Sequence, residues 1–190
     1  MRHGFKAWCE RTSTEIRQSL DLADTFRFEP ELLAHQFGVH IFDIDDLPGL
    51  DRQSIHQLTA VDPESWSAIT VQVNEQRITV LNPAHSKERR RNSLTHELAH
   101  VILNHSLAGV GVSPEGVLLQ QSCDPEQEEE ADWLSATLLV PRDLLTVAYF
   151  QKQDASSCAA LFGVSTELMS WRLRMTGVIT QARRRGKNKK

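Results

Sequence analysis

The feature that most constrains this chain is the run His96-Glu97-Leu98-Ala99-His100, near the middle of its 190 residues. Two histidines four residues apart on a helix lie only about 40° apart around its axis, so both rings project from one face. Neutral imidazole nitrogens at that spacing can reach a single ion, and they suit zinc. The spacing therefore predicts a helix here, with a metal site on one side of it.

Glu97 follows His96 directly, about 100° further round such a helix. A carboxylate in this position flanks the ion without binding it, and it can accept a proton from a water that the ion activates. Leu98 and the apolar residues at 101–103 give the helix a buried side. The pattern predicts a catalytic zinc site in which Glu97 is the general base, on a helix that runs through the core.

The third ligand has to come from elsewhere in the chain. His105 is the nearest histidine, but it lies about 140° round the helix from His100 and could not share the ion while the helix continues. A third histidine six residues after His100 is excluded, because position 106 is Ser. The acidic segment 124–132 offers carboxylates instead.

Within that acidic segment, Glu128 and Asp132 are four residues apart, so on a helix both can face the two histidines. Our interpretation is that Glu128 binds the zinc and that Asp132 accepts a hydrogen bond from the outer nitrogen of a zinc-binding histidine. Glu129, about 100° round the same helix, stays open as the alternative ligand. Three protein ligands leave one position for water, as a catalytic zinc site requires.

Hydrolysis of a peptide bond also calls for a donor that stabilises the oxyanion. The sequence does not choose among the candidates, which are His105, Tyr149, and one of Arg89, Arg90 and Arg91. The strand expected at 77–82 could offer its edge to an extended peptide substrate, since strand addition is a common way to hold a cleavable segment.

The secondary-structure signals around these motifs predict an α+β fold. β-branched runs at 68–73 and 77–81 indicate a hairpin, and alternation over 39–44 indicates a further strand. We expect a small twisted sheet containing antiparallel strands, packed against the motif helix, with a helical C-terminal part. Helices are expected at 3–20, 30–37, 86–105, 124–140, from 141 onward, 155–162 and 166–176. Residues 46–65 and 106–123 are expected to be loops, the latter long and flexible.

Composition narrows the classes of protein that remain. A formal net charge of −4 argues against a general nucleic-acid binder, and we expect no direct binding to nucleic acid. No apolar run in the chain is long enough for a membrane helix. The N-terminal residues do not have the apolar stretch typical of a signal peptide. Cys9, Cys123 and Cys158 are odd in number and far apart, which disfavours a disulfide framework. We therefore expect a cytoplasmic protein.

Two segments together resemble the ImmA/IrrE family of zinc metallopeptidases. One is the motif helix from Arg91 to His105, and the other runs from Glu128 to Pro141. The similarity extends over residues 30–175. The chain departs from the common pattern at Asp132, where Asn is frequent, and at Trp133, where another large apolar residue is frequent. Neither change removes a ligand.

The resemblance implies a gluzincin-like zinc site with His96, His100 and Glu128 as ligands and Glu97 as the catalytic residue. It also implies a protein substrate. Such enzymes typically cleave a helix-turn-helix repressor or antitoxin, often encoded alongside, and thereby switch on mobile-element or stress-response genes. We accordingly expect four parts: an N-terminal helical segment (1–28), a zincin-like metallopeptidase core (29–150), a C-terminal helical hairpin packed on the core (151–178) and a solvated basic tail (179–190).

Two other functions remain as alternatives. Residues 155–176 have the sequence pattern of a helix-turn-helix with a turn at Gly163, and the basic tail follows them. Both features would suit a DNA-binding regulator. Against this, only Arg172 and Arg174 lie on the second helix as possible contacts to DNA. The other alternative is a zinc protein that cleaves nothing and acts as a toxin or binding partner, although the retained Glu97 argues against it.

Overall fold

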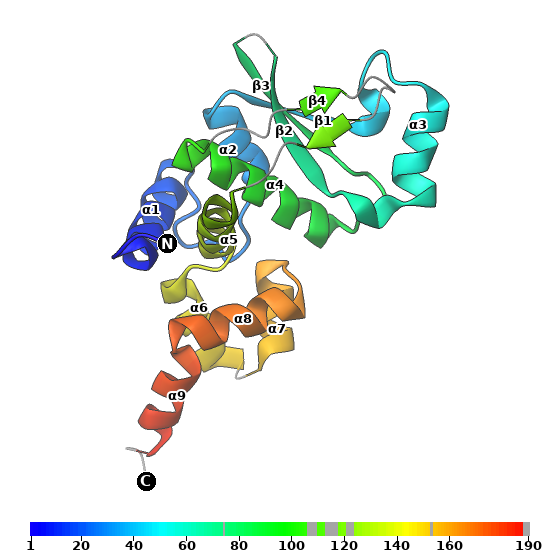
Figure 1. Ribbon diagram of the computed structural model, residues 1–190. Helices are drawn as coiled ribbons and strands as arrows, with labels where there is room; N and C mark the ends of the chain where they lie inside the picture. The colour runs from blue at the N-terminus through cyan, green and yellow to red at the C-terminus, as the bar shows by residue number, and fades with distance from the viewer. Residues whose placement is uncertain (74, 106–109, 113–117, 121–123, 153, 188–190) are drawn as a thin grey trace. The chain divides into compact units, whose positions relative to one another are not determined.

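The computed structural model (Figure 1) describes residues 1–73, 75–105, 110–112, 118–120, 124–152 and 154–187. The chain divides into two compact units. The first contains Met1 and Glu29–Asp132, and the second contains Arg2–Phe28 and Trp133–Lys190. The N-terminal helix therefore groups with the C-terminal helices, while the functional division expected from the sequence stays a prediction. No helix within the described ranges is long and apolar enough to cross a membrane.

The first unit is built on a three-stranded sheet of order β1–β3–β2. β1 (Val39–Asp43) runs parallel to β3 (Gln76–Leu81), and β2 (Ala68–Val73) is antiparallel to β3. The α+β fold and the predicted hairpin are confirmed. The idea that residues 77–82 offer a free edge is wrong, because β3 is paired on both sides. Strand order depends on β1, a partner distant in sequence, so hairpin periodicity could not predict it.

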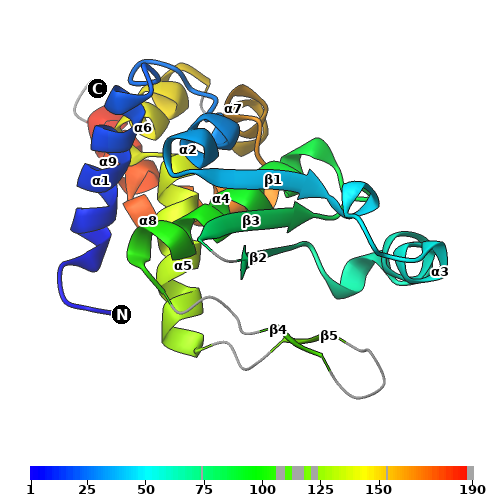
Figure 2. The ribbon, with the colours of Figure 1, turned by 90° about the horizontal axis from the view of Figure 1, so that it is seen from above.

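Helix α4 (Lys87–Leu103) carries the histidine motif and lies against the sheet, in contact with β2 and β3 (Figure 2). Ser86 begins it as predicted, since its hydroxyl accepts a hydrogen bond from the N–H of Arg89. Leu94 and Leu98 are buried on the same side of the helix. α2 (Pro30–Gln36) also packs on α4 and on β1. The motif helix is thus held in the core of this unit, as expected.

The connection between β1 and β2 is more helical than predicted. The sequence predicts a loop here. In chain order, the structure has a 3-10 turn at Ile44–Asp46, α3 at Arg52–His56, a π-helical turn at Gln57–Val61 and a second 3-10 turn at Pro63–Ser65. Asp51 starts α3 by accepting hydrogen bonds from the N–H groups of Gln53 and Ser54. These helical turns are short and bury only Ile44, so they leave little apolar periodicity to detect.

The segment between α4 and α5 also differs from the prediction of an unstructured connection. β4 (Val110–Val112) and β5 (Leu118–Gln120) form a two-stranded antiparallel pair. Each strand has only three residues, which is too short for a periodic pattern to stand out. The remainder of residues 106–123 lies outside the described residues.

The described part of the second unit contains helices and no strand. Its helices are α1 (Phe5–Ser19), the end of α5 (Pro125–Leu139), α6 (Arg142–Lys152), α7 (Ala155–Phe162), α8 (Thr166–Thr176) and α9 (Val178–Lys187). The predicted limits of α7 and α8 are confirmed. The structure adds a helix that the sequence analysis did not predict: after Gly177, with φ at 70°, the residues of the expected basic tail continue as α9 as far as Lys187. Val178, fully buried, anchors that last helix.

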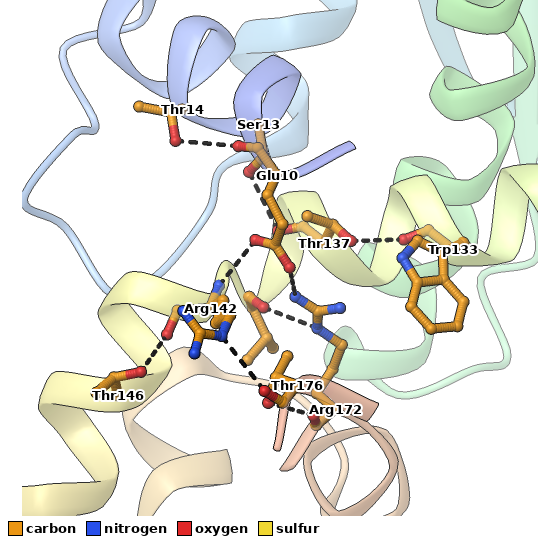
Figure 3. Close-up of polar contacts among 10 residues, drawn as sticks. Glu10, Ser13, Thr14, Trp133, Thr137, Arg142, Thr146, Arg172 and Thr176 are labelled. Atoms are coloured by element: carbon orange, nitrogen blue, oxygen red, sulfur yellow. Dashed lines mark hydrogen bonds and ion pairs between the residues drawn. The ribbon is translucent and has the colours of Figure 1, made fainter. Parts of the chain in front are cut away.

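A buried network of polar side chains joins the helices of the second unit (Figure 3). The guanidinium of Arg172 is fully buried; its Nε donates to the carbonyl of Val140 at 2.9 Å and its Nη2 donates to Glu10 at 2.7 Å. The other oxygen of Glu10 accepts the backbone N–H of Arg142 at 3.0 Å. One ion pair therefore ties α1 to α8, to the end of α5 and to the first turn of α6.

Candidate metal centre

Helices α4 and α5 bring His96, His100 and Glu128 together in the first unit. The Nε2 atoms of the two histidines are 3.0 Å apart. The carboxylate oxygens of Glu128 lie 3.2 Å from Nε2 of His96 and 3.4 Å from Nε2 of His100. A tetrahedral zinc ion with nitrogen and oxygen ligands at about 2.0–2.2 Å would hold such atoms about 3.4 Å apart. The three donor atoms are thus spaced as an ion of this kind requires, and their chemistry fits it.

Asp132 lies one turn after Glu128 on α5 and contacts the other side of His96. Its Oδ1 is 3.0 Å from Nδ1 of His96. Because Nε2 of His96 faces the cluster, Nδ1 is the outer nitrogen of that ring. The contact lies where the sequence-based interpretation expects an orienting carboxylate.

Glu129, the alternative ligand, points elsewhere. Its carboxylate lies 3.8 Å from the amino group of Met1, and its side chain is 62% exposed. The cluster of possible ligands among the described residues contains Glu128 and not Glu129. The geometry therefore favours Glu128, which sits with Asp132 on the side of α5 that meets the histidines.

Burial and neighbouring charge set the protonation of the two histidines. Burial acts to lower the pKa of His96, but the hydrogen bond with Asp132 and the nearby carboxylates outweigh it, so the pKa is raised. Burial, followed by the charge of His96, lowers the pKa of His100 to about 4. The ring of His100 is therefore neutral at neutral pH, which is the form that binds a metal.

The carboxyl group of Glu97, the residue after His96, is hydrogen-bonded to Thr70 of β2. Burial raises the pKa of its carboxyl group, and hydrogen bonds from the hydroxyl and the backbone N–H of Thr70 oppose that rise. The Thr70 hydroxyl is also 2.9 Å from that of Thr79, its directly paired residue on β3. Sequence reasoning missed Thr70. The available signal was a pair of threonines facing each other in the predicted hairpin.

The candidate oxyanion donors fall in different places. His105 lies behind His100, with the Nδ1 atoms of the two rings 3.0 Å apart. Arg89 pairs with Glu64, and Arg90 pairs with Asp43. The remaining candidates are Arg91, on α4 five residues before His96, and Tyr149, on α6 in the second unit.

Comparison with known proteins adds an independent observation. A family model described as the IrrE N-terminal-like domain, peptidase M78, matches residues 34–174. A search of curated proteins finds no match. Among solved structures, a Mycobacterium tuberculosis transcriptional regulator is similar, with a TM-score of 0.52 and 18% identity over 90% of this chain and 46% of that one. At this identity the likeness shows the fold alone, and the chain spans less than half of the regulator's length.

Proposed function

Because the chain belongs to the IrrE N-terminal-like (peptidase M78) family, we propose that it is a zinc-dependent endopeptidase that cleaves a helix-turn-helix repressor. The observation that carries the proposal is the convergence of His96, His100 and Glu128, whose ligand atoms lie 3.0–3.4 Å from one another. Two nitrogens and one carboxylate oxygen suit zinc, and three ligands leave the fourth position to water. A structural zinc site would have four protein ligands instead.

The residues around the ligands have separate tasks in this proposal. Asp132 accepts a hydrogen bond from Nδ1–H of His96, which fixes the ring tautomer and leaves Nε2 unprotonated toward the ion. A bound zinc ion would supply Lewis acidity, which acidifies a water molecule and polarises the scissile carbonyl. Glu97 would accept a proton from the attacking water and pass it to the leaving amine. Thr70 holds the Glu97 carboxylate in place through its hydrogen bonds.

The sheet offers a way to hold an extended substrate. In the described part of the first unit, β2 is an edge strand, and it carries Thr70, the hydrogen-bond partner of Glu97. A peptide added along β2 would pair through its backbone with this strand. We propose β2, in place of the 77–82 strand, as the edge that aligns a substrate beside the general base.

The DNA-binding alternative loses one of the two arginines that its second helix could offer to DNA. Arg172, one of two arginines on the second helix of the helix-turn-helix-like segment, is fully buried in its ion pair with Glu10 and is not exposed to a ligand. Arg174 is left as the exposed arginine of α8. The solved structure titled a transcriptional regulator shares the fold but carries no further weight at its level of identity. A gel shift with generic duplex DNA tests this alternative, and binding that weakens steeply with salt would revive it.

The decisive experiment compares the wild type with Glu97→Gln. Both proteins are purified, their zinc content is measured, and each is incubated with the repressor encoded by the neighbouring gene and with an unfolded general protease substrate. We expect about one zinc ion per chain in both proteins. We expect cleavage by the wild type, and a rate about 10²–10⁴-fold lower for Glu97→Gln.

The other outcomes separate the alternatives. A wild type purified without zinc, or equal cleavage by both proteins, would reject the proposed mechanism. Zinc in both proteins with cleavage of neither substrate would favour the zinc protein that acts by binding.

A further inference from the structure

We propose that His105 and Glu130 position His100, as an outer pair of residues behind the metal centre. Glu130 orients His105, and His105 in turn fixes the ring of His100. This inference rests on the proposed function, because it concerns the same metal centre. It gives His105 a positioning role in place of the oxyanion-donor role considered from the sequence.

The end of helix α4 brings His105 to this place. Asn104 adopts a left-handed conformation, with φ at 53°, and ends the helix. The chain turns back, so that the N–H of His105 donates to the carbonyl of His100 at 3.0 Å. The ring centroids of His100 and His105 are 5.0 Å apart, and their Nδ1 atoms are 3.0 Å apart. A residue that a continuous helix would carry about 140° away thus contacts the ligand.

The direction of the hydrogen bond between the two rings follows from the role of His100. Its Nε2 faces the other ligand atoms, so binding a metal there requires an unprotonated Nε2 and places the proton on Nδ1. His100 then donates to Nδ1 of His105, and that nitrogen must be unprotonated. A neutral His105 therefore carries its proton on Nε2, which lies 3.7 Å from the carboxylate of Glu130.

The contact between His105 and Glu130 is buried. The side chains of His105 and Glu130 are only 7% and 8% exposed, so solvent screens their interaction little. Glu130 also favours the His105 tautomer with Nε2–H toward it, which is the one that can accept from His100. Asp132, the outer partner of His96, is 72% exposed by contrast. The two ligands are thus supported differently, one directly at the surface and one through a buried relay.

The test uses metal affinity, measured by competition of the purified protein against a chelating zinc indicator. His105→Leu keeps an apolar side chain of moderate size but removes the acceptor for His100, and we expect zinc to bind about 10–100-fold more weakly. His105→Asn places an amide oxygen near the position of Nδ1 and should restore most of the affinity. The control is His85→Leu, a second buried histidine of the same unit, whose Nε2 contacts the carbonyl of Pro63 at 2.9 Å. It should leave zinc affinity unchanged, even where stability falls.

A spectroscopic measurement on the wild type keeps the inference testable if a variant fails to fold. Long-range ¹H–¹⁵N spectra of the zinc-loaded protein should show His100 protonated at Nδ1 and His105 protonated at Nε2. Zinc affinity equal to the wild type in His105→Leu, or a proton on Nδ1 of His105, would overturn the positioning role and leave the proposed function standing. A wild type that binds no zinc would overturn both.

Discussion

Each of the two units contains a cluster of polar side chains, half-buried in the first and built around a buried arginine in the second, and the clusters differ in what their atoms offer one another. In the second unit, Arg172 supplies donors to Glu10 and to a backbone carbonyl, so the charges are paired within the protein. In the first unit, His96, His100 and Glu128 bring together nitrogen lone pairs and carboxylate oxygens. Lone pairs held 3.0–3.4 Å apart repel each other unless a proton or a cation lies between them.

This difference separates a cluster that stabilises the fold from one that is built for a ligand. A buried ion pair between matched partners is costly to break from one side. A cluster of acceptors costs stability until an ion binds, and it then gains the free energy of metal binding. Changes in the second cluster should therefore alter stability, while changes in the first should alter metal binding and catalysis.

The largest effect is expected when the first cluster loses a ligand. Glu128→Ala should weaken zinc binding by more than the about 100-fold cost of losing an outer partner, and cleavage should be lost with it. The matched control is Glu129→Ala, whose side chain is exposed near Met1 and should be dispensable for zinc. Zinc titration of both variants checks this. Loss of zinc from Glu129→Ala alone would show that the ligand is wrongly assigned.

The second cluster should respond in the opposite way. Arg172→Met leaves the carboxylate of Glu10, which is 29% exposed, without its buried partner. We expect the free energy of unfolding to fall by about 3 kcal/mol, toward the low end for a broken buried pair because Glu10 keeps some contact with solvent. Zinc affinity of the folded protein should not change. Denaturant unfolding and zinc titration measure both quantities.

Arg174→Met is the control for that experiment, since Arg174 is exposed on the same helix. Its effect should stay within about 0.5 kcal/mol. A tenfold drop in zinc affinity for Arg172→Met would contradict the assignment of the second cluster to stability alone.

The smallest effect concerns the support of the general base. Thr70→Val removes the hydroxyl that donates to Glu97, and one such bond contributes about 1 kcal/mol, or about fivefold in rate. We expect kcat to fall by about that factor while zinc affinity stays the same. Thr79→Val, one bond further from Glu97, should reduce kcat less. An equal or larger loss in Thr79→Val would mean that the pair acts through the sheet and not through the carboxylate.

Much of the metal centre could be predicted from the sequence, because residues at helical spacing lie on the same face of a helix. The spacing of His96 with His100, and of Glu128 with Asp132, predicts which atoms can meet if two helices face each other. In the structure Glu128 contacts both histidines and Asp132 contacts His96. The limits of α7 and α8 were predictable because Gly163 and Gly177 follow them. The α+β class followed in the same way from patterns local to each element.

The other features of the site and the fold depend on contacts that the periodicity of the sequence does not predict. His105 reaches His100 because Asn104 ends the helix in a left-handed turn, an event that the 3.6-residue repeat cannot place. Thr70 meets Glu97 because β2 packs on α4, and β3 is central because β1 pairs with it from a distant part of the chain. α9 was missed because a glycine followed by basic residues is typical of a solvated tail as much as of a helix start.

The most direct test of the central claim is the crystal structure of the zinc-loaded protein, with the ion located by anomalous scattering. It should show one zinc ion per chain, with Nε2 of His96 and of His100 at about 2.0–2.1 Å and a carboxylate oxygen of Glu128 at about 2.0–2.2 Å. The fourth position should be open to water. Zinc bound elsewhere, held by Glu129 in place of Glu128, or closed off by a fourth protein ligand would contradict the account.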